Sequence, residues 1–129
     1  MAARDRVRLT ETYTQGEVRT MTTTVEYIRY RIALDDQQAF EDAYARAAES
    51  LAASPECIDY ELARCEEEKE RYILRIRWTS VKDHLEGFRK GEHFPAFFGA
   101  IRPYVTAIEE MQHYLVTGVV GTGKGAGQR

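Results

Sequence analysis

The chain of 129 residues is poor in the residue types that mark several classes of protein. It has only two cysteines, Cys57 and Cys65, at the two ends of a segment whose pattern predicts one extended strand. At about 3.3 Å per residue, the ends of that strand lie far beyond the reach of a disulfide. We therefore expect two separate free thiols. Neither cysteine has a Cys or His neighbour at the spacing of a metal site, and we expect no metal.

Long apolar runs and blocks of one charge are also missing. No run approaches the roughly 20 apolar residues of a membrane span, and the amino-terminal sequence MAARDRVRLTETYTQGEVRT is too charged for a secretion signal. The 18 basic and 21 acidic residues are interleaved, with a net charge of -3. We therefore expect a cytoplasmic protein that binds neither nucleic acid nor a membrane.

Both ends of the sequence lack apolar periodicity. Residues 1–23 are largely polar, and residues 117–129 are rich in glycine. We expect both to be flexible tails, because they offer few side chains that could pack. Residues 24–116 lie between them and are long enough for one domain with a hydrophobic core.

Hydrophobic periodicity in the first half of this domain predicts a strand and then a helix. Residues alternate from Val25 to Ile32, which is typical of a strand with one buried face. Apolar residues then recur at helical spacing until Pro55, and Asp35 or Asp36 can cap the start of that helix.

The second half of the domain predicts a hairpin, a broken helix and a last strand. Alternation from Cys57 to Arg64 and from Tyr72 to Trp78 surrounds an acidic turn and indicates two antiparallel strands. A helical pattern follows; it is interrupted at Gly91 and continues to Pro103. The final segment, Ile108 to Val116, alternates again.

This order predicts an α+β, ferredoxin-like fold with a β-α-β-β-α-β antiparallel sheet and both helices on one face. The opposite face then carries charges that can pair across strands. These charges belong to Arg29, Arg31, Asp59, Glu61, Arg75 and Arg77. We predict that this face meets its counterpart in a second subunit, because a two-fold pairing buries sheet faces and protects edges.

Three segments resemble the antibiotic biosynthesis monooxygenase (ABM) family: the hairpin SPECIDYELARCEEEKERYILRIRWTS, the segment HFPAFF and the strand IEEMQHYLV. The resemblance covers roughly Val25 to Val116 and implies a homodimeric α+β barrel. Similar proteins include cofactor-independent oxygenases of polyketide quinols, quinol monooxygenases and haem-degrading enzymes. The resemblance therefore implies oxidation of a phenolic, quinol or polycyclic aromatic small molecule by dioxygen, with no cofactor.

Individual residues match the polyketide-oxidising and haem-degrading members of the family to different degrees. Trp78 matches a Trp that lies beside the substrate in the polyketide-oxidising members. Leu74 stands where those enzymes have Asn, and His84 where they have Tyr. The haem-degrading members have an Asn, a Trp and a haem-ligating His that this sequence lacks at the matching positions. His93 precedes the position of that ligand by one turn.

A cofactor-free oxygenase needs an apolar pocket, a base, and donors that hold a developing oxyanion. We expect Trp78 to shape the pocket, and His84 or His113 to act as base or oxyanion donor. The other expected lining residues are Tyr30, Tyr60, Leu74, Phe88, His93, Phe94, Phe97 and Phe98. The same aromatic pattern also suits a plain core. Two alternatives stay open: a module that binds an aromatic ligand without catalysis, and a haem-binding protein that uses His93.

Overall fold

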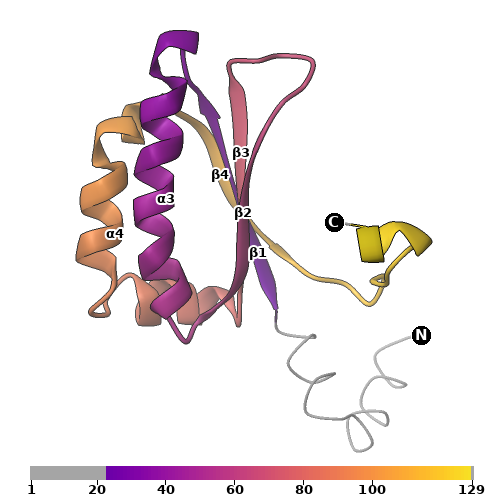
Figure 1. The fold of residues 1–129 in the computed structure, drawn as a ribbon. Coiled ribbons are helices and arrows are strands. Elements are labelled where there is room, and N and C mark those ends of the chain that lie inside the picture. The colour runs from indigo at the N-terminus through magenta and orange to yellow at the C-terminus, as the bar shows by residue number, and fades with distance from the viewer. Residues whose placement is uncertain (1–22, 129) are drawn as a thin grey trace, which may run out of the picture.

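The computed structural model describes residues 23–128, which form one antiparallel sheet covered by helices on one face (Figure 1). The strand order is β2-β3-β1-β4. The strands are β1 (Thr24–Arg31), β2 (Cys57–Arg64), β3 (Arg71–Trp78) and β4 (Ile108–Leu115). This topology confirms the predicted ferredoxin-like fold. Residues 1–22 of the predicted amino-terminal tail lie outside the described residues.

Strand β1 runs through the middle of the sheet, between β3 and β4. Its residues alternate as predicted, so Ile28 and Tyr30 are buried under the helices and Arg29 is exposed. The same alternation places Glu26 on the helix-covered face, where it is only 2% exposed. A carboxyl group is thus built into the core on the central strand.

Helix α3 (Gln37–Ala53) packs along the sheet through an apolar stripe. Phe40, Tyr44, Ala47 and Leu51 recur at helical spacing and belong to the buried core. The predicted helix start is confirmed, but the predicted capping role is wrong. Asp36 occupies the N-cap position, yet its side chain makes no capping hydrogen bond.

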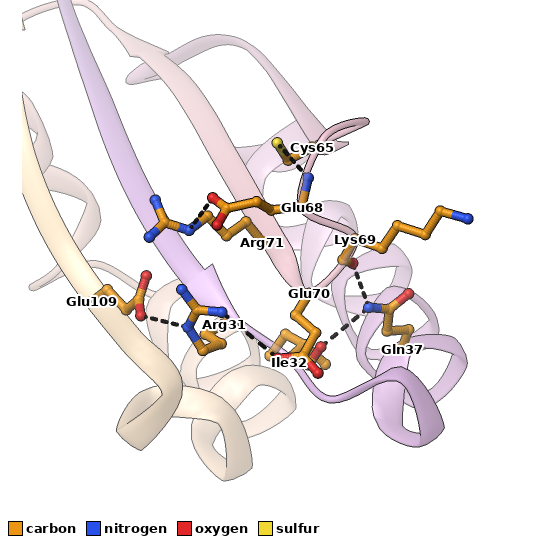
Figure 2. A network of polar contacts seen from close by, with 9 residues as sticks. All are labelled: Arg31, Ile32, Gln37, Cys65, Glu68, Lys69, Glu70, Arg71 and Glu109. Carbon is orange, nitrogen blue, oxygen red and sulfur yellow. Dashed lines mark hydrogen bonds and ion pairs between the residues drawn. The ribbon is translucent and has the colours of Figure 1, made fainter.

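A polar network around Gln37 ties the start of α3 to the far end of the sheet (Figure 2). The Gln37 side-chain nitrogen donates to the carbonyl oxygens of Ile32, at 3.1 Å, and Lys69, at 2.6 Å. Beside it, Arg31 binds Glu109 of β4 at 2.9 Å. This network fixes the end of the sheet that lies away from Trp78, because Arg31 and Trp78 occupy opposite ends of the β1 and β3 pairing.

The second helical region is broken, as predicted, but it begins differently. Residues Asp83–Phe88 form a π-helical turn (η2), which is followed by α4 (Phe94–Ile101). A Cβ at Gly91 would lie 2.6 Å from the Gly87 carbonyl oxygen, so the break needs a residue without a side chain. The α-helix ends before Pro103, and the 3₁₀ helix η3 (Arg102–Ala107) continues through that proline.

The sheet face without helices carries the predicted cross-strand ion pairs. Arg75 lies 3.5 Å from Asp59 and 3.3 Å from Glu61, and Arg77 lies 3.6 Å from Asp59. These charges pair across β2 and β3, which confirms the predicted ladder. The second subunit that we expect on this face stays a prediction.

The remaining sequence predictions concern the cysteines and the carboxyl terminus. Cys57 and Cys65 are free thiols, as predicted. Residues 117–127 are exposed and include part of the short 3₁₀ helix η4 (Lys124–Gln128). The flexibility predicted for this segment stays a prediction. None of the helices within residues 23–128 combines the length and the apolar character needed to cross a membrane.

Candidate functional site

A cavity of about 180 Å³ lies between the helices and the sheet, beside the end of β3. Its wall is mainly aromatic and aliphatic. Many of the predicted pocket residues do line this cavity. They are Tyr30, Trp78, His84, Phe88, Phe94, Phe97 and Phe98. Four phenylalanines from η2 and α4 thus meet two aromatic residues from the sheet in one apolar enclosure.

Trp78 is completely buried and holds two polar neighbours in place. Its ring stacks on that of His84, with ring centroids 4.3 Å apart and ring planes only 12° apart. Its indole nitrogen donates a hydrogen bond of 3.0 Å to the Oε1 atom of Glu26. The Trp therefore positions both a carboxyl group and an imidazole at the cavity.

Glu26, His84 and His113 form a continuous line of polar side chains, which we call the Glu-His-His chain. The Nε2 atom of His84 lies 3.5 Å from Glu26 Oε1, and its Nδ1 atom lies 2.8 Å from His113 Nε2. Glu26 and His113 are direct partners in the pairing of β1 with β4. The π-helical turn places His84 over them, and its widened ring is closed by the Arg89 amide donating to the His84 carbonyl oxygen at 3.0 Å.

Burial controls the charge of the Glu-His-His chain. Desolvation lowers the pKa of His84 to about 3, and the positive charges of Arg89 and His113 lower it further in the same direction. Desolvation and Arg89 also lower the pKa of His113. Desolvation raises the pKa of Glu26, against the hydrogen bond from Trp78 and the charge of Arg89. Both imidazoles are therefore neutral at pH 7, and a neutral imidazole can accept a proton.

The three side chains of the Glu-His-His chain are also of the types that bind metal ions. One ligand atom from each of Glu26, His84 and His113 lies within 4.8 Å of the others, and two histidines with one carboxylate can hold a transition metal. A single ion needs all three ligand atoms to face one point. Here His84 turns one nitrogen toward Glu26 and its other nitrogen toward His113. This arrangement suits a line of polar contacts better than a metal centre.

The structure does not bring every predicted residue to this cavity. Tyr60 and Leu74 line a separate groove between α3 and β2. Strand β2 lies at the edge of the sheet, so Tyr60 faces the helix side opposite Ile76 but is 38% exposed. His93 occupies the N-cap position of α4 and lines a different, shallow hollow. Its ring therefore lies away from the proposed catalytic residues.

The polar residues at the cavity that were not predicted from the sequence are Glu26, Tyr44 and Arg89. The signal for Glu26 was available, because it shares the alternation of Ile28 and Tyr30 and so had to face the core. Tyr44 belongs to the apolar residues that recur at helical spacing before Pro55. Arg89 directly follows the buried Phe88 at the end of the π-helical turn. Its position at the cavity was not predictable, because no sequence pattern indicated a π-helical turn.

Comparisons with known proteins agree with this fold. The antibiotic biosynthesis monooxygenase family model matches residues 23–100. Protein YczJ of Bacillus subtilis (strain 168), itself uncharacterised, is 30% identical over 78 residues, which cover 60% of this chain and 82% of YczJ.

Solved structures share the fold at lower sequence identity. SnoaB, a cofactor-independent oxygenase from Streptomyces nogalater, has a TM-score of 0.56 and 22% identity, over 78% of this chain and 96% of its own. A conserved protein from Methanosarcina mazei Go1 has a TM-score of 0.64 and 16% identity, over 78% and 99% of the two chains. Because the family model matches more than half of the sequence, the chain belongs to the antibiotic biosynthesis monooxygenase family.

Proposed function

We propose that the protein is a cofactor-independent monooxygenase that oxidises a phenolic, quinol or polycyclic aromatic molecule with dioxygen. The observation that carries this proposal is the Glu-His-His chain at the wall of an aromatic cavity. Membership of the ABM family and the fold shared with SnoaB support the class of reaction.

The two imidazoles supply the base that this reaction needs. The neutral imidazole of His84, which lines the cavity, accepts the proton of a bound phenol and shares it with His113, and the phenolate that forms is electron-rich enough to reduce dioxygen. The 2.8 Å contact between the rings lets a proton taken up at one histidine leave at the other. His113 is only partly buried, so the chain leads from the cavity toward solvent.

The reaction balances without an external reductant. The aromatic substrate loses two hydrogen atoms and gains one oxygen atom, and the second oxygen atom leaves as water. All four electrons taken up by dioxygen thus come from the substrate. The apolar wall, with Phe88 and Phe97 buried, keeps water away from the phenolate and strengthens the electrostatic interactions around it.

We further propose that the protein works as a homodimer joined through the sheet face without helices. That face exposes the ion pairs of Arg75 and Arg77 and an edge-on contact between Tyr27 and Tyr114, whose ring centroids lie 5.4 Å apart. Charged ladders and tyrosines of this kind suit a two-fold contact that leaves the cavity on the helix side open to substrate.

Oxygen uptake by metal-stripped protein tests the proposed reaction. We expect uptake with members of a panel of anthrols, naphthohydroquinones and simple quinols, and a strong loss of it in Trp78→Phe and His84→Ala. His93→Ala is the matched control, because His93 lies outside the cavity, and it should keep full activity. Unchanged turnover in both cavity variants would show that the assignment is wrong. Binding of the panel without any uptake would favour the non-catalytic ligand-binding module.

A further inference from the structure

A second polar site lies in the same cavity, apart from the histidines. Tyr30 of β1 and Tyr44 of α3 both line the cavity, and their hydroxyl groups are hydrogen-bonded to each other. The two residues are 0% and 4% exposed. We call them the tyrosine pair.

The tyrosine pair has one proton more than its own hydrogen bond uses. Two hydroxyl groups contain two protons, and the bond between them takes up one. Within residues 23–128, neither hydroxyl has a further hydrogen-bond partner. Desolvation raises the pKa of Tyr30 to about 12 and also raises the pKa of Tyr44, so both stay protonated at neutral pH. A buried donor without an acceptor is costly, and a ligand oxygen in the cavity would remove that cost.

The two polar sites stand at different places along β1. Glu26 and Tyr30 are four residues apart on the same face of the strand, which corresponds to about 13 Å of backbone. Ile28 lies between them, so the middle of the cavity is apolar. A ligand that meets both polar sites therefore needs oxygens at the two ends of an apolar ring system. The opposite edges of a fused two-ring aromatic provide such an arrangement, whereas neighbouring positions on one edge do not.

We infer that the substrate is a fused two-ring aromatic with oxygen atoms on opposite edges. One oxygen is the phenol that gives its proton to the histidines. The other is a hydroxyl or carbonyl oxygen that accepts a hydrogen bond from the tyrosine pair. The inference rests on the proposed function only in taking this cavity as the substrate site. The tyrosine pair then fixes which end of the substrate meets His84.

Isothermal titration calorimetry without dioxygen tests the inference through three probes. Naphthalene-2,6-diol carries oxygens on opposite edges, naphthalene-2,3-diol carries both on one edge, and 2-naphthol carries only one. We expect wild-type protein to bind the 2,6-diol about tenfold more tightly than either other probe, as one additional buried hydrogen bond would give. Equal affinity for the three probes would overturn the inference, and this comparison needs no variant.

A double variant assigns the preference to the tyrosine pair. Tyr30→Phe with Tyr44→Phe keeps the ring shapes and removes both hydroxyls, since either hydroxyl alone could still donate. We expect 2-naphthol binding to persist and the tenfold preference to disappear. Tyr72→Phe is the matched control, because its hydroxyl binds Glu41 outside the cavity, and it should keep the preference. A preference that survives in the double variant would contradict the assignment.

The two proposals fail in different experiments. Calorimetry under nitrogen reports only binding, whereas oxygen uptake reports the reaction. A selective 2,6-diol complex with no uptake from any substrate would overturn the proposed function and leave the inference standing. Uptake from aromatic substrates without any preference among the three probes would overturn the inference alone.

Discussion

The Nδ1 atom of His84 and the Nε2 atom of His113 lie 2.8 Å apart, although the two residues are 29 positions apart in the chain. At that distance one imidazole donates and the other accepts, so the tautomer of one ring fixes that of the other. Glu26 then lies at the far side of His84, 3.5 Å from its second nitrogen. The protonation of the three side chains is therefore linked.

Glu26→Gln tests the role of the carboxyl group as a positioning residue. The amide oxygen can still accept the hydrogen bond from Trp78, but the side chain of the variant cannot ionise to stabilise a protonated His84. We expect kcat to fall about 10- to 100-fold with KM nearly unchanged, measured by oxygen uptake. Glu110→Gln changes an exposed ion pair with Arg29 and serves as the control. Equal kcat for wild type and Glu26→Gln would remove Glu26 from the account.

The lowered pKa of His84 makes folding depend on pH. The folded state holds this imidazole neutral down to about pH 3, whereas the unfolded chain protonates it near 6.5. The unfolded state thus binds more protons between these values, and the free energy of unfolding falls as the pH is lowered through that window. We expect His84 to contribute about 1.4 kcal/mol per pH unit.

Urea denaturation of wild type and His84→Gln from pH 6.5 down to pH 4 measures this contribution. Glu26 acts in the opposite sense, because its raised pKa makes the folded state hold more protons above pH 4.5. The difference between the two proteins isolates His84. Parallel curves for wild type and variant would show that this imidazole is not buried neutral.

Arg89→Gln should raise the pKa of both imidazoles, because the positive charge of Arg89 lowers them in the wild type. His113 is the easier group to follow, since it is partly exposed and titrates below 6.5. Nuclear magnetic resonance of the imidazole protons against pH gives the value directly. Arg102→Gln, at an exposed position beyond α4, should leave the titration of His113 unchanged. No shift in Arg89→Gln would contradict the electrostatic account.

Arg75→Glu tests the proposed dimer. In the wild type Arg75 forms ion pairs with Asp59 and Glu61, and the substitution places a third negative charge beside them. We expect light scattering to show a dimer for the wild type and a monomer for this variant, because repulsion opens the ladder. Lys90→Glu reverses a charge on the helix side and should leave the dimer intact. A wild-type monomer at all concentrations would refute the contact.

The strands and helices were largely predictable because their signals are local. Alternation located all four strands, and helical spacing located α3 together with the break at Gly91. The bulge between Cys57 and Asp59 was not predictable, because it depends on how β2 pairs with β3. The face of Tyr60 was predicted, but not the strand order that puts β2 at the edge of the sheet, away from the cavity.

The candidate site was predictable only in part, since its central contact joins distant elements. The sequence indicated Trp78, His84 and His113 one by one, but the distance between the two histidines follows from the β1 and β4 pairing and from the π-helical turn. The alternation of β1 did indicate that the side chain of Glu26 faces the core. A charged residue in phase with an apolar face is a signal that can be used in other sequences.

Isotope labelling follows the fate of both oxygen atoms of dioxygen. Metal-stripped protein is given ¹⁸O₂ and an aromatic diol, and the product is examined by mass spectrometry. We expect the product to gain one ¹⁸O atom and the other to appear in water, and we expect His84→Ala to abolish both. Labelled product that forms only after a divalent metal ion is added would contradict the account and would make Glu26, His84 and His113 metal ligands instead of a proton-accepting chain.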